Sequence, residues 1–379
     1  MSISKKKEIT SIGIMSGSSL DGADGTLVSY EKCTSILAHA YHPFSDSLRR
    51  NIDKIRLSKA IELTDFCKLS SDIADEYSVV VKKLSDHSIK LKRQIDVIGA
   101  HGQTIWHQPP LYSIQICNYA RLAHKTGISV VGDFRNADIA NGGTGAPLAP
   151  LFHTAAFYSP EEKRSVINLG GIANISVLGK PTLGWDIGPG VTLIDSWYAK
   201  HNSEGSFDIY GKWARGGKIN HKLLECMLGE AFFSQEPPKS TGQEIFNINW
   251  IEGRIRESNV DISAQDVQST LTELTALLCK KTIDKFAPKT DALYFCGGGT
   301  KNTYLMERLA EVNQNTKLHS TKKLGIEPEH VECGLISWLA VKHILGEPVI
   351  THHITGSQCA PKILGALYPA VNHLAASRA

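Results

Sequence analysis

Short apolar runs alternate with longer amphipathic stretches along this chain of 379 residues. The runs SIGIM (11–15) and DGTLVSY (24–30) flank a turn of small residues at the distance expected for a β-hairpin. Between 45 and 92, Leu, Ile and Val recur at helical spacing among many charges, and DVIGAHG then indicates a strand that ends in glycine. This order of strands and helices predicts an α/β protein.

The alternation continues to the end of the chain. Further strands are predicted at SIQICN, ISVVGDF, SVINLGG, ISVLG and ALYFC. Helices are predicted over 191–201, 216–233 and 264–285, from Asn302, and over 330–346, where an amphipathic pattern stops at a glycine.

Two segments share one scheme of apolar strand, small-residue turn and second strand: SIGIMSGSSLDGADGTLV and SVINLGGIANISVLG. Together they suggest a duplicated architecture that closes on a ligand from both sides, although each alone also fits an ordinary hairpin. The chain exceeds the size of a usual single core, and NGGTGAP (141–147) is the best candidate for a crossing between halves. We therefore expect one domain over 1–138, with 350–379 packing back on it, and a second over 139–349.

Composition excludes several functional classes. The 41 basic and 38 acidic residues are spread along the chain, so no basic stripe suggests a nucleic-acid partner or a membrane anchor. No run approaches the roughly 20 apolar residues of a membrane span. The eight cysteines lie far apart without a C-x-x-C pair, which suggests neither a zinc site nor a disulfide framework and fits a reducing cytoplasm.

Glycine-rich turns are the candidate phosphate sites. Glycines permit positive φ and let backbone N–H groups approach a phosphate closely, and Ser18 and Ser19 could add hydroxyl donors. CGGGTKN (296–302) lies between a predicted strand and helix, where a nucleotide could bind, although a tight structural turn is an equal alternative. The chain has neither a G-x-x-x-x-G-K-[ST] P-loop nor a G-x-S-x-G elbow, which disfavours P-loop NTPases and serine hydrolases of that type.

Polar residues follow two predicted strands, and ligands of α/β sheets usually lie at such strand ends. The alternative is that these residues hold loops in place through hydrogen bonds. They are His101, Gln103, Thr104 and His107 in the first segment and Asp133, Arg135 and Asp138 in the second. Asp186 lies in a Trp-Asp-Ile-Gly-Pro-Gly turn before a helix, where a partly desolvated carboxylate could accept a proton. The alternative role of Asp186 is to cap that helix.

Together the motifs resemble those of the 1,6-anhydro-N-acetylmuramic acid kinases, a family of the sugar kinase, Hsp70 and actin superfamily. The resemblance runs through nearly the whole chain, in the segments GIMSGSSLDGADG, GAHGQTIWHQP, GDFRNADIANGGTGAPLAPLFH, NLGGIANIS, GWDIGPG, FDIYGKWARGG, PPKSTGQEIFNINW, CGGGTKNTYLMERL and TGSQCAPKILGALYP. It implies an α/β fold of two duplicated ribonuclease H-like (actin-like ATPase) domains around a nucleotide and substrate cleft.

The resemblance also implies roles for individual residues. Asp186 would be the catalytic base, and Asp21 could contact Mg²⁺ through water. The sugar would be contacted by Gln103, Thr104, Arg135 and Glu332. ATP would be contacted by Gly17, Ser18, Ser19, Leu20, Asp21, Gly22, Ala23 and Asp24, by Gly170, Gly171 and Asn174, and by Gly297, Gly298 and Gly299.

The implied reaction opens the anhydro bridge with water and transfers the γ-phosphoryl group of ATP to O6, giving N-acetylmuramic acid 6-phosphate and ADP. This step belongs to cell-wall recycling in a bacterial cytoplasm, and the resemblance suggests a homodimer. The family usually has Thr and Asn where Ile187 and Val191 stand, so we expect two polar groups to be missing beside the base. Alternatives are another sugar or small-acid kinase of the superfamily, a related phosphatase, or a non-catalytic ATP-dependent binding protein.

Overall fold

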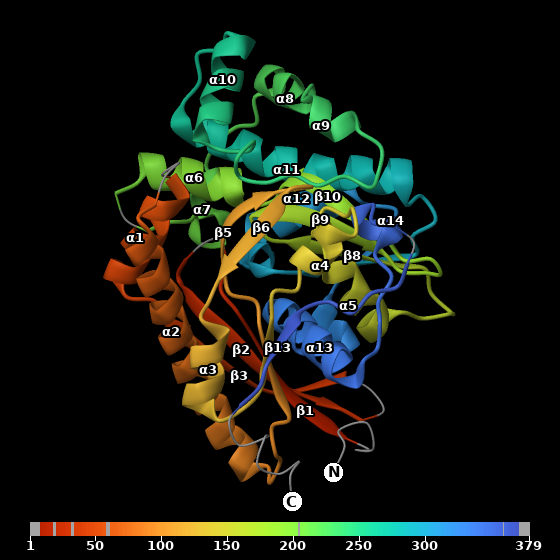
Figure 1. The fold of residues 1–379 in the computed structure, drawn as a ribbon. Helices are drawn as coiled ribbons and strands as arrows, with labels where there is room; N and C mark the ends of the chain where they lie inside the picture. Colours follow the sequence, from red (N-terminus) through yellow and green to blue (C-terminus); the bar gives the residue numbers. More distant parts are fainter. Residues whose placement is uncertain are drawn as a thin grey trace, which may run out of the picture. The chain divides into compact units, whose positions relative to one another are not determined.

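The structure, a computed structural model, divides into two compact units (Figure 1). The first unit comprises Met1–Phe152 and His330–Ala379, and the second comprises His153–Glu329. The residues that the structure describes are 8–17, 20–31, 34–57, 61–203, 205–358 and 360–370. No helix within these ranges is both long and apolar enough to cross a membrane.

The first unit is built on a six-stranded sheet and a separate two-stranded ribbon. Its strands are β1 (Ile9–Met15), β2 (Gly22–Tyr30), β3 (Thr34–Pro43), β4 (Val97–Ala100), β5 (Gln103–Gln108), β6 (Tyr112–Ile116), β7 (Val130–Gly132) and β13 (Ala366–Tyr368). Its helices are α1 (Asp46–Leu57), α2 (Leu63–Lys90), α3 (Tyr119–Thr126), α4 (Asn136–Ala140), α13 (Val331–Leu345) and α14 (His352–Thr355), and α5 (Ala149–Phe157) crosses the boundary to the second unit.

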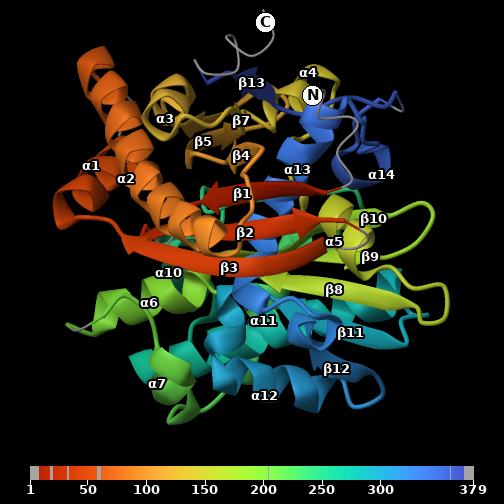
Figure 2. The same ribbon diagram turned by 90° about the horizontal axis from the view of Figure 1, so that it is seen from below.

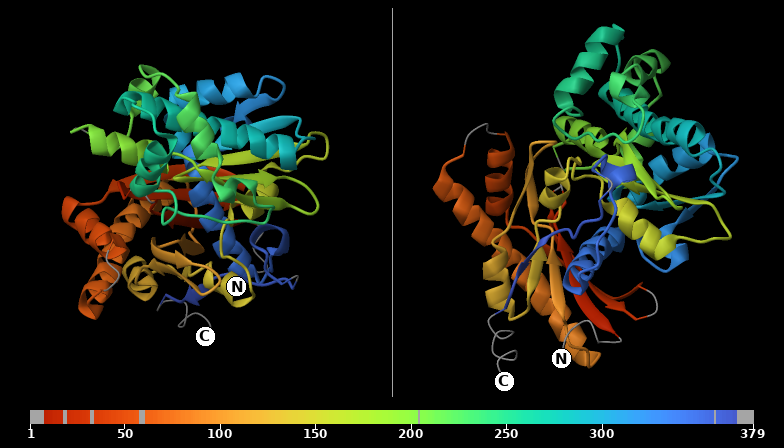
Figure 3. Two further views of the ribbon diagram at one scale, coloured as in Figure 1. Left: turned by 90° about the horizontal axis from the view of Figure 1, so that it is seen from above. Right: turned by 45° about the vertical axis from the view of Figure 1, so that its right-hand side comes forward.

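The second unit has a five-stranded sheet under a layer of helices that includes the long α11 (Figure 3). Its strands are β8 (Arg164–Leu169), β9 (Ile172–Val177), β10 (Leu183–Pro189), β11 (Ala292–Cys296) and β12 (Lys317–Ser320). Its α-helices are α6 (Thr192–His201), α7 (Lys212–Arg215), α8 (His221–Leu228), α9 (Ala231–Ser234), α10 (Ile248–Ser258), α11 (Ala264–Phe286) and α12 (Thr303–Val312). Short 3-10 turns are η2 (Ile209–Gly211), η3 (Gly298–Lys301), η4 (Thr321–Leu324) and, at the boundary, η5 (Pro328–His330).

The two sheets repeat one topology. The order is β3-β2-β1-β4-β7 in the first unit, with β13 added antiparallel at the β7 edge, and β10-β9-β8-β11-β12 in the second. In both, the first three strands form an antiparallel meander, and the next two run parallel to its first strand. This confirms the predicted α/β fold of two duplicated ribonuclease H-like (actin-like ATPase) domains.

Helices cover both faces of the first sheet. They pack closely because glycines, which have no side chain, lie at the contact points. A Cβ on Gly13 would overlap the backbone carbonyl of Cys333 in α13, whereas a Cβ on Gly25 would lie 2.5 Å from Val80 in α2. Because Gly25 pairs with Ile14, the neighbour of Gly13, these two glycines face opposite sides of the sheet. Figure 2 shows β1, β2 and β3 with α2 in orange and α13 in blue.

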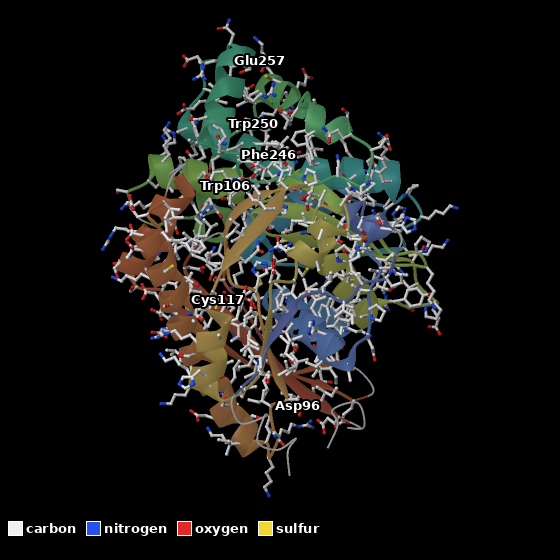
Figure 4. The ribbon with its side chains drawn as sticks, viewed as in Figure 1. Asp96, Trp106, Cys117, Phe246, Trp250 and Glu257 are labelled. Carbon is white, nitrogen blue, oxygen red and sulfur yellow. The ribbon has the colours of Figure 1, made fainter. Side chains whose placement is uncertain are left out.

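The second core is rich in aromatic side chains. Phe246 and Trp250 lie close together, with ring centroids 5.4 Å apart (Figure 4). Phe246 is fully buried and also stacks on Phe233 at 5.5 Å. Together with α8, α10 and α11, these rings cover the apolar face of the second sheet.

The chain enters and leaves the second unit at positions other than those predicted. The first unit runs past the predicted boundary at 138/139 to Phe152, and the chain returns to it at His330, before the predicted residue 350. Buried Asp138 accepts hydrogen bonds from the Gly145 N–H (2.8 Å) and from the hydroxyls of Thr351 and Thr355, so the turn at 141–147 is tied to the C-terminal segment.

Candidate active site

A row of polar side chains crosses four strands of the second sheet. Asp186 on β10 pairs with Asn174 on β9, Asn174 pairs with Asn168 on β8, and Asn168 pairs with Cys296 on β11. Directly paired residues point to the same face of a sheet. The structure therefore places the predicted base and the predicted ATP ligand Asn174 next to each other.

The carboxylate of Asp186 is buried and hydrogen-bonded. Its Oδ2 atom accepts hydrogen bonds from the Ser240 hydroxyl (2.8 Å) and the Thr241 backbone N–H (3.0 Å), and the side chain is only 5% exposed. Its backbone N–H also donates to the carbonyl of Lys239 (3.0 Å). The segment 239–241 thus orients the carboxylate, a contact that the sequence did not predict.

Buried Lys239 anchors that segment. Its ammonium group donates to two backbone carbonyls of α9, at 3.0 and 3.2 Å. Burial lowers the pKa of Lys239 to about 8, with the charge of Lys285 adding to the effect. The segment that holds Asp186 is therefore tied to a neighbouring helix.

The turn at Gly170 and Gly171 joins β8 to β9 and is packed against the start of α6. The two glycine carbonyls accept hydrogen bonds from the backbone N–H groups of residues 190–192, at 2.9 to 3.1 Å. A Cβ on Gly190 would overlap the carbonyl oxygen of Gly170. These contacts fix the turn directly beyond the polar row.

The turn at Gly297–Gly299 lies beside the end of β8. Gly297 has a φ of +86°, and a Cβ there would overlap the side-chain oxygen of Asn168. A Cβ on Gly299 would lie 2.7 Å from the Leu169 carbonyl. A Cβ on Gly298 meets no described atom within 4 Å, so Gly298 is the position at which a ligand could approach the backbone.

The opening turn of the first unit is only partly described, because Ser18 and Ser19 lie outside the described residues. The Gly17 carbonyl accepts a hydrogen bond from the Gln103 amide (3.3 Å). Leu20 has a φ of +58° and a buried side chain. Only the backbone of Leu20 could therefore contact a nucleotide.

The second half of that turn carries two carboxylates, Asp21 and Asp24, which lie in different environments. Asp24 Oδ1 lies 2.9 Å from the ring nitrogen Nε2 of His39, whereas the side chain of Asp21 is exposed. The backbone carbonyl of Asp21 accepts a hydrogen bond from a tyrosine hydroxyl of β3 (2.8 Å). Gly22 and Ala23 are buried, and a Cβ on Gly22 would overlap a carbonyl of β3. Asp21 is thus the more exposed of the two carboxylates.

Two of the predicted sugar ligands lie in one polar region of the first unit. Arg135 donates to His101 Nε2 through Nε (3.1 Å) and Nη2 (3.0 Å), and to the Gly145 carbonyl through Nη1 (2.8 Å). Thr104 accepts a weak hydrogen bond from the Gln115 amide on the opposite strand (3.4 Å). The structure thus adds His101 to this region as a partner of Arg135.

Glu332 belongs to the C-terminal segment of the first unit, which begins at His330. It lies in the first turn of α13 and is half-buried. Its neighbour Cys333 donates through Sγ to the Asp24 carbonyl at 3.3 Å. The helix that carries Glu332 is therefore fixed to the opening hairpin.

Comparison with known proteins identifies the family. A family model described as anhydro-N-acetylmuramic acid kinase matches residues 9–370. The chain belongs to the anhydro-N-acetylmuramic acid kinase family. It is 41% identical over 362 residues to a protein of that name from Pseudomonas syringae pv. syringae (strain B728a), covering 95% of this chain and 99% of the relative. It is 38% identical over 366 residues to one from Legionella pneumophila (strain Corby), covering 95% and 98%.

In this family member, the side chain of residue 187 points away from the candidate base. Ile187 and Trp185 flank Asp186 on β10, are each 2% exposed and belong to the core packed against α11. The expectation that Ile187 removes a polar group beside Asp186 was therefore wrong, because neighbouring strand residues point to opposite faces. The partly buried Val191 packs at the Gly299 turn, where a Cβ on that glycine would lie 2.9 Å from it.

Several polar residues near Arg135 had no assigned role in the sequence analysis. His107 Nδ1 lies 2.8 Å from the Ser113 hydroxyl, which also accepts from the Gln115 amide (2.7 Å). Burial and then the charge of Arg135 lower the pKa of His107 to about 4, so its ring is neutral. Within the described ranges, His107 Nε2 and Gln115 Oε1 are buried without a hydrogen-bond partner. The sequence feature that could have identified these residues is the alternation of polar and apolar residues along β5 and β6.

Proposed function

We propose that this protein is an ATP-dependent kinase that opens 1,6-anhydro-N-acetylmuramic acid with water and phosphorylates O6. The products are N-acetylmuramic acid 6-phosphate and ADP, as in peptidoglycan recycling. The observation that carries this proposal is the buried carboxylate of Asp186, aligned with Asn174 and Asn168 next to two glycine turns in a chain that the family model matches over residues 9–370. Full-length matches to relatives of that name disfavour a different sugar kinase or a non-catalytic binding protein.

Asp186 is the proposed general base. It takes a proton from the attacking water, whose oxygen bonds to the anomeric carbon while the bond from that carbon to the bridging oxygen breaks. The released O6 then attacks the γ-phosphorus, and the bond to the β-phosphate oxygen breaks to give ADP. Ser240 and Thr241 donate hydrogen bonds to Oδ2 and thereby orient the carboxylate for proton uptake.

The remaining predicted ligands divide between the two substrates. Arg135 would pair with the lactyl carboxylate, a task that suits the planar guanidinium group, while Gln103, Thr104 and Glu332 would contact the sugar. The nucleotide would be contacted by the opening turn of the first unit and by the Gly170 and Gly297–Gly299 turns of the second.

Magnesium, the compartment and the dimer stay part of the proposal. No three His, Cys, Asp or Glu side chains among the described residues converge as a metal cluster, and Asp21 is the exposed carboxylate of the opening turn. Mg²⁺ held by phosphate oxygens and water, with Asp21 as a water-mediated partner, would offset the phosphate charge. We expect the reaction in the cytoplasm, where ATP is available, and a homodimer.

The test is Asp186→Asn, which keeps the size of the side chain but replaces the basic oxygen. Turnover should fall by about 10²-fold or more, the usual contribution of a general base, while ATP binding by calorimetry stays close to wild type. Asp284→Asn is the matched control, because that aspartate is exposed and, among the described residues, pairs with Lys280 one helical turn away. Near-normal turnover of Asp186→Asn would remove Asp186 from the mechanism.

A further inference from the structure

The guanidinium group of Arg135 is held on two sides by neutral acceptors. On one side, Nε and Nη2 both donate to the same atom, His101 Nε2, at 3.1 and 3.0 Å. On another, Nη1 donates to the Gly145 carbonyl at 2.8 Å. These contacts fix the plane and direction of the group.

Hydrogen bonding fixes the tautomer of His101. Its Nδ1 atom lies 2.8 Å from the Gly102 carbonyl, which can only accept, so Nδ1 carries the proton. Nε2 therefore has a lone pair, and that lone pair faces the two N–H groups of Arg135. Burial, reinforced by the charge of Arg135, lowers the pKa of His101 to about 3, which keeps the ring neutral at physiological pH.

The second acceptor is also firmly held. Gly145 has a φ of +69°, and its N–H donates to the carboxylate of Asp138 at 2.8 Å. Asp138 is fully buried and also accepts from the hydroxyls of Thr351 and Thr355. The Gly145 carbonyl therefore belongs to a turn that the C-terminal segment keeps in place.

We propose that His101 is a positioning residue that aims Arg135 at the carboxylate of the substrate and thereby makes the enzyme selective for sugars that carry one. This inference rests on the proposed function, in which Arg135 binds the lactyl carboxylate. The ring of His101 is hydrogen-bonded to Arg135 and Gly102, and we assign its effect on the substrate to the contact with the arginine.

Two substitutions separate the two contacts of His101. In His101→Asn, the amide group takes the place of Nδ1, keeping the contact to Gly102 and losing the acceptor for Arg135. In His101→Gln, the amide oxygen reaches the place of Nε2, keeping the acceptor and losing the Gly102 contact. A purely structural role predicts similar behaviour of both variants.

Steady-state kinetics would be measured with 1,6-anhydro-N-acetylmuramic acid and with 1,6-anhydro-N-acetylglucosamine, which lacks the lactyl carboxylate. For His101→Asn we expect KM for the acid to rise by about tenfold or more, with kcat changed by less than about threefold, because a charged hydrogen-bonding pair is misaligned. The preference for the acid over the neutral sugar should fall by the same factor. His101→Gln should keep most of that preference.

Two results would overturn the inference: an unchanged preference in His101→Asn, or equal losses in both variants. If His101→Asn does not fold, a full loss of preference in folded His101→Gln also contradicts it, whereas a retained preference together with a KM for ATP near that of wild type supports it. If wild-type protein does not phosphorylate the acid at all, the proposed function fails, and this outcome is distinct from failure of the role of His101.

Discussion

Replacing Ser240 with alanine tests how Asp186 is held. The Oδ2 atom of Asp186 accepts the Ser240 O–H at 2.8 Å and the Thr241 N–H at 3.0 Å. Ser240→Ala removes the first of these bonds and leaves the second. Because Asp186 is 5% exposed, bulk water cannot freely replace the missing donor.

The size of the effect follows from the charge of the acceptor. A hydrogen bond to a charged group contributes about 1.5–3 kcal/mol, and a change of 1.4 kcal/mol corresponds to a factor of ten. If the bond orients the carboxylate for proton transfer, Ser240→Ala should lower kcat by about 10- to 100-fold. KM for ATP should change little, because the glycine turns keep their contacts.

The assay is ADP release at saturating sugar and ATP, coupled to an indicator enzyme. Ser240→Thr, which keeps the hydroxyl, should restore most of the activity. Ser234→Ala is the control in the same unit, since that exposed hydroxyl donates to a backbone carbonyl of its own helix turn. A Ser240→Ala enzyme with turnover within twofold of wild type would refute the idea that this contact orients the base.

Three further predictions concern the fold and its glycines. Gly13→Ala should lower the free energy of unfolding by about 3 kcal/mol, measured by urea denaturation, because its Cβ would overlap the backbone of α13. Gly297→Ala should raise KM for ATP and lower Tm, because its φ is +86° and the added Cβ would overlap Asn168. Burial lowers the pKa of His153 from 6.5 to about 3, so below pH 6.5 the unfolded chain binds more protons and stability should fall as pH drops toward 3. The His153→Gln variant should show a smaller loss between pH 7 and pH 4, and an equal loss would contradict this origin.

Local sequence signals were sufficient for many of the elements and for the duplication, although β3, α10 and β12 were not predicted. The hairpins around the first two glycine turns follow from alternating apolar residues. The helix predicted from Asn302 is α12, and the structure shows that Asn302 caps it by accepting from the Leu305 N–H at 3.0 Å. The return of α13 to the first sheet was not predictable in this way. It depends on Gly13 and Gly99, whose missing side chains admit a helix from the far end of the chain.

In the candidate site too, some features could be predicted from local motifs and others depend on the fold. Asp186 could be selected from its own motif, but Ser240 lies 54 residues further along the chain and meets it only through the fold. The row from Asp186 to Cys296 depends on strand register, which no local motif specifies. The face of β10 to which the Ile187 side chain points could likewise be determined only from the structure, because a motif alone does not tell which side chains face the core.

The most direct test of the account is the mass of the product formed from Mg²⁺-ATP and 1,6-anhydro-N-acetylmuramic acid by the wild-type protein. The proposed chemistry predicts a sugar product heavier than the substrate by one phosphoryl group and one water, formed in step with ADP. A product heavier by a phosphoryl group alone would contradict the water-opening step that we assign to Asp186. ADP without any sugar phosphate would contradict the proposed kinase activity itself.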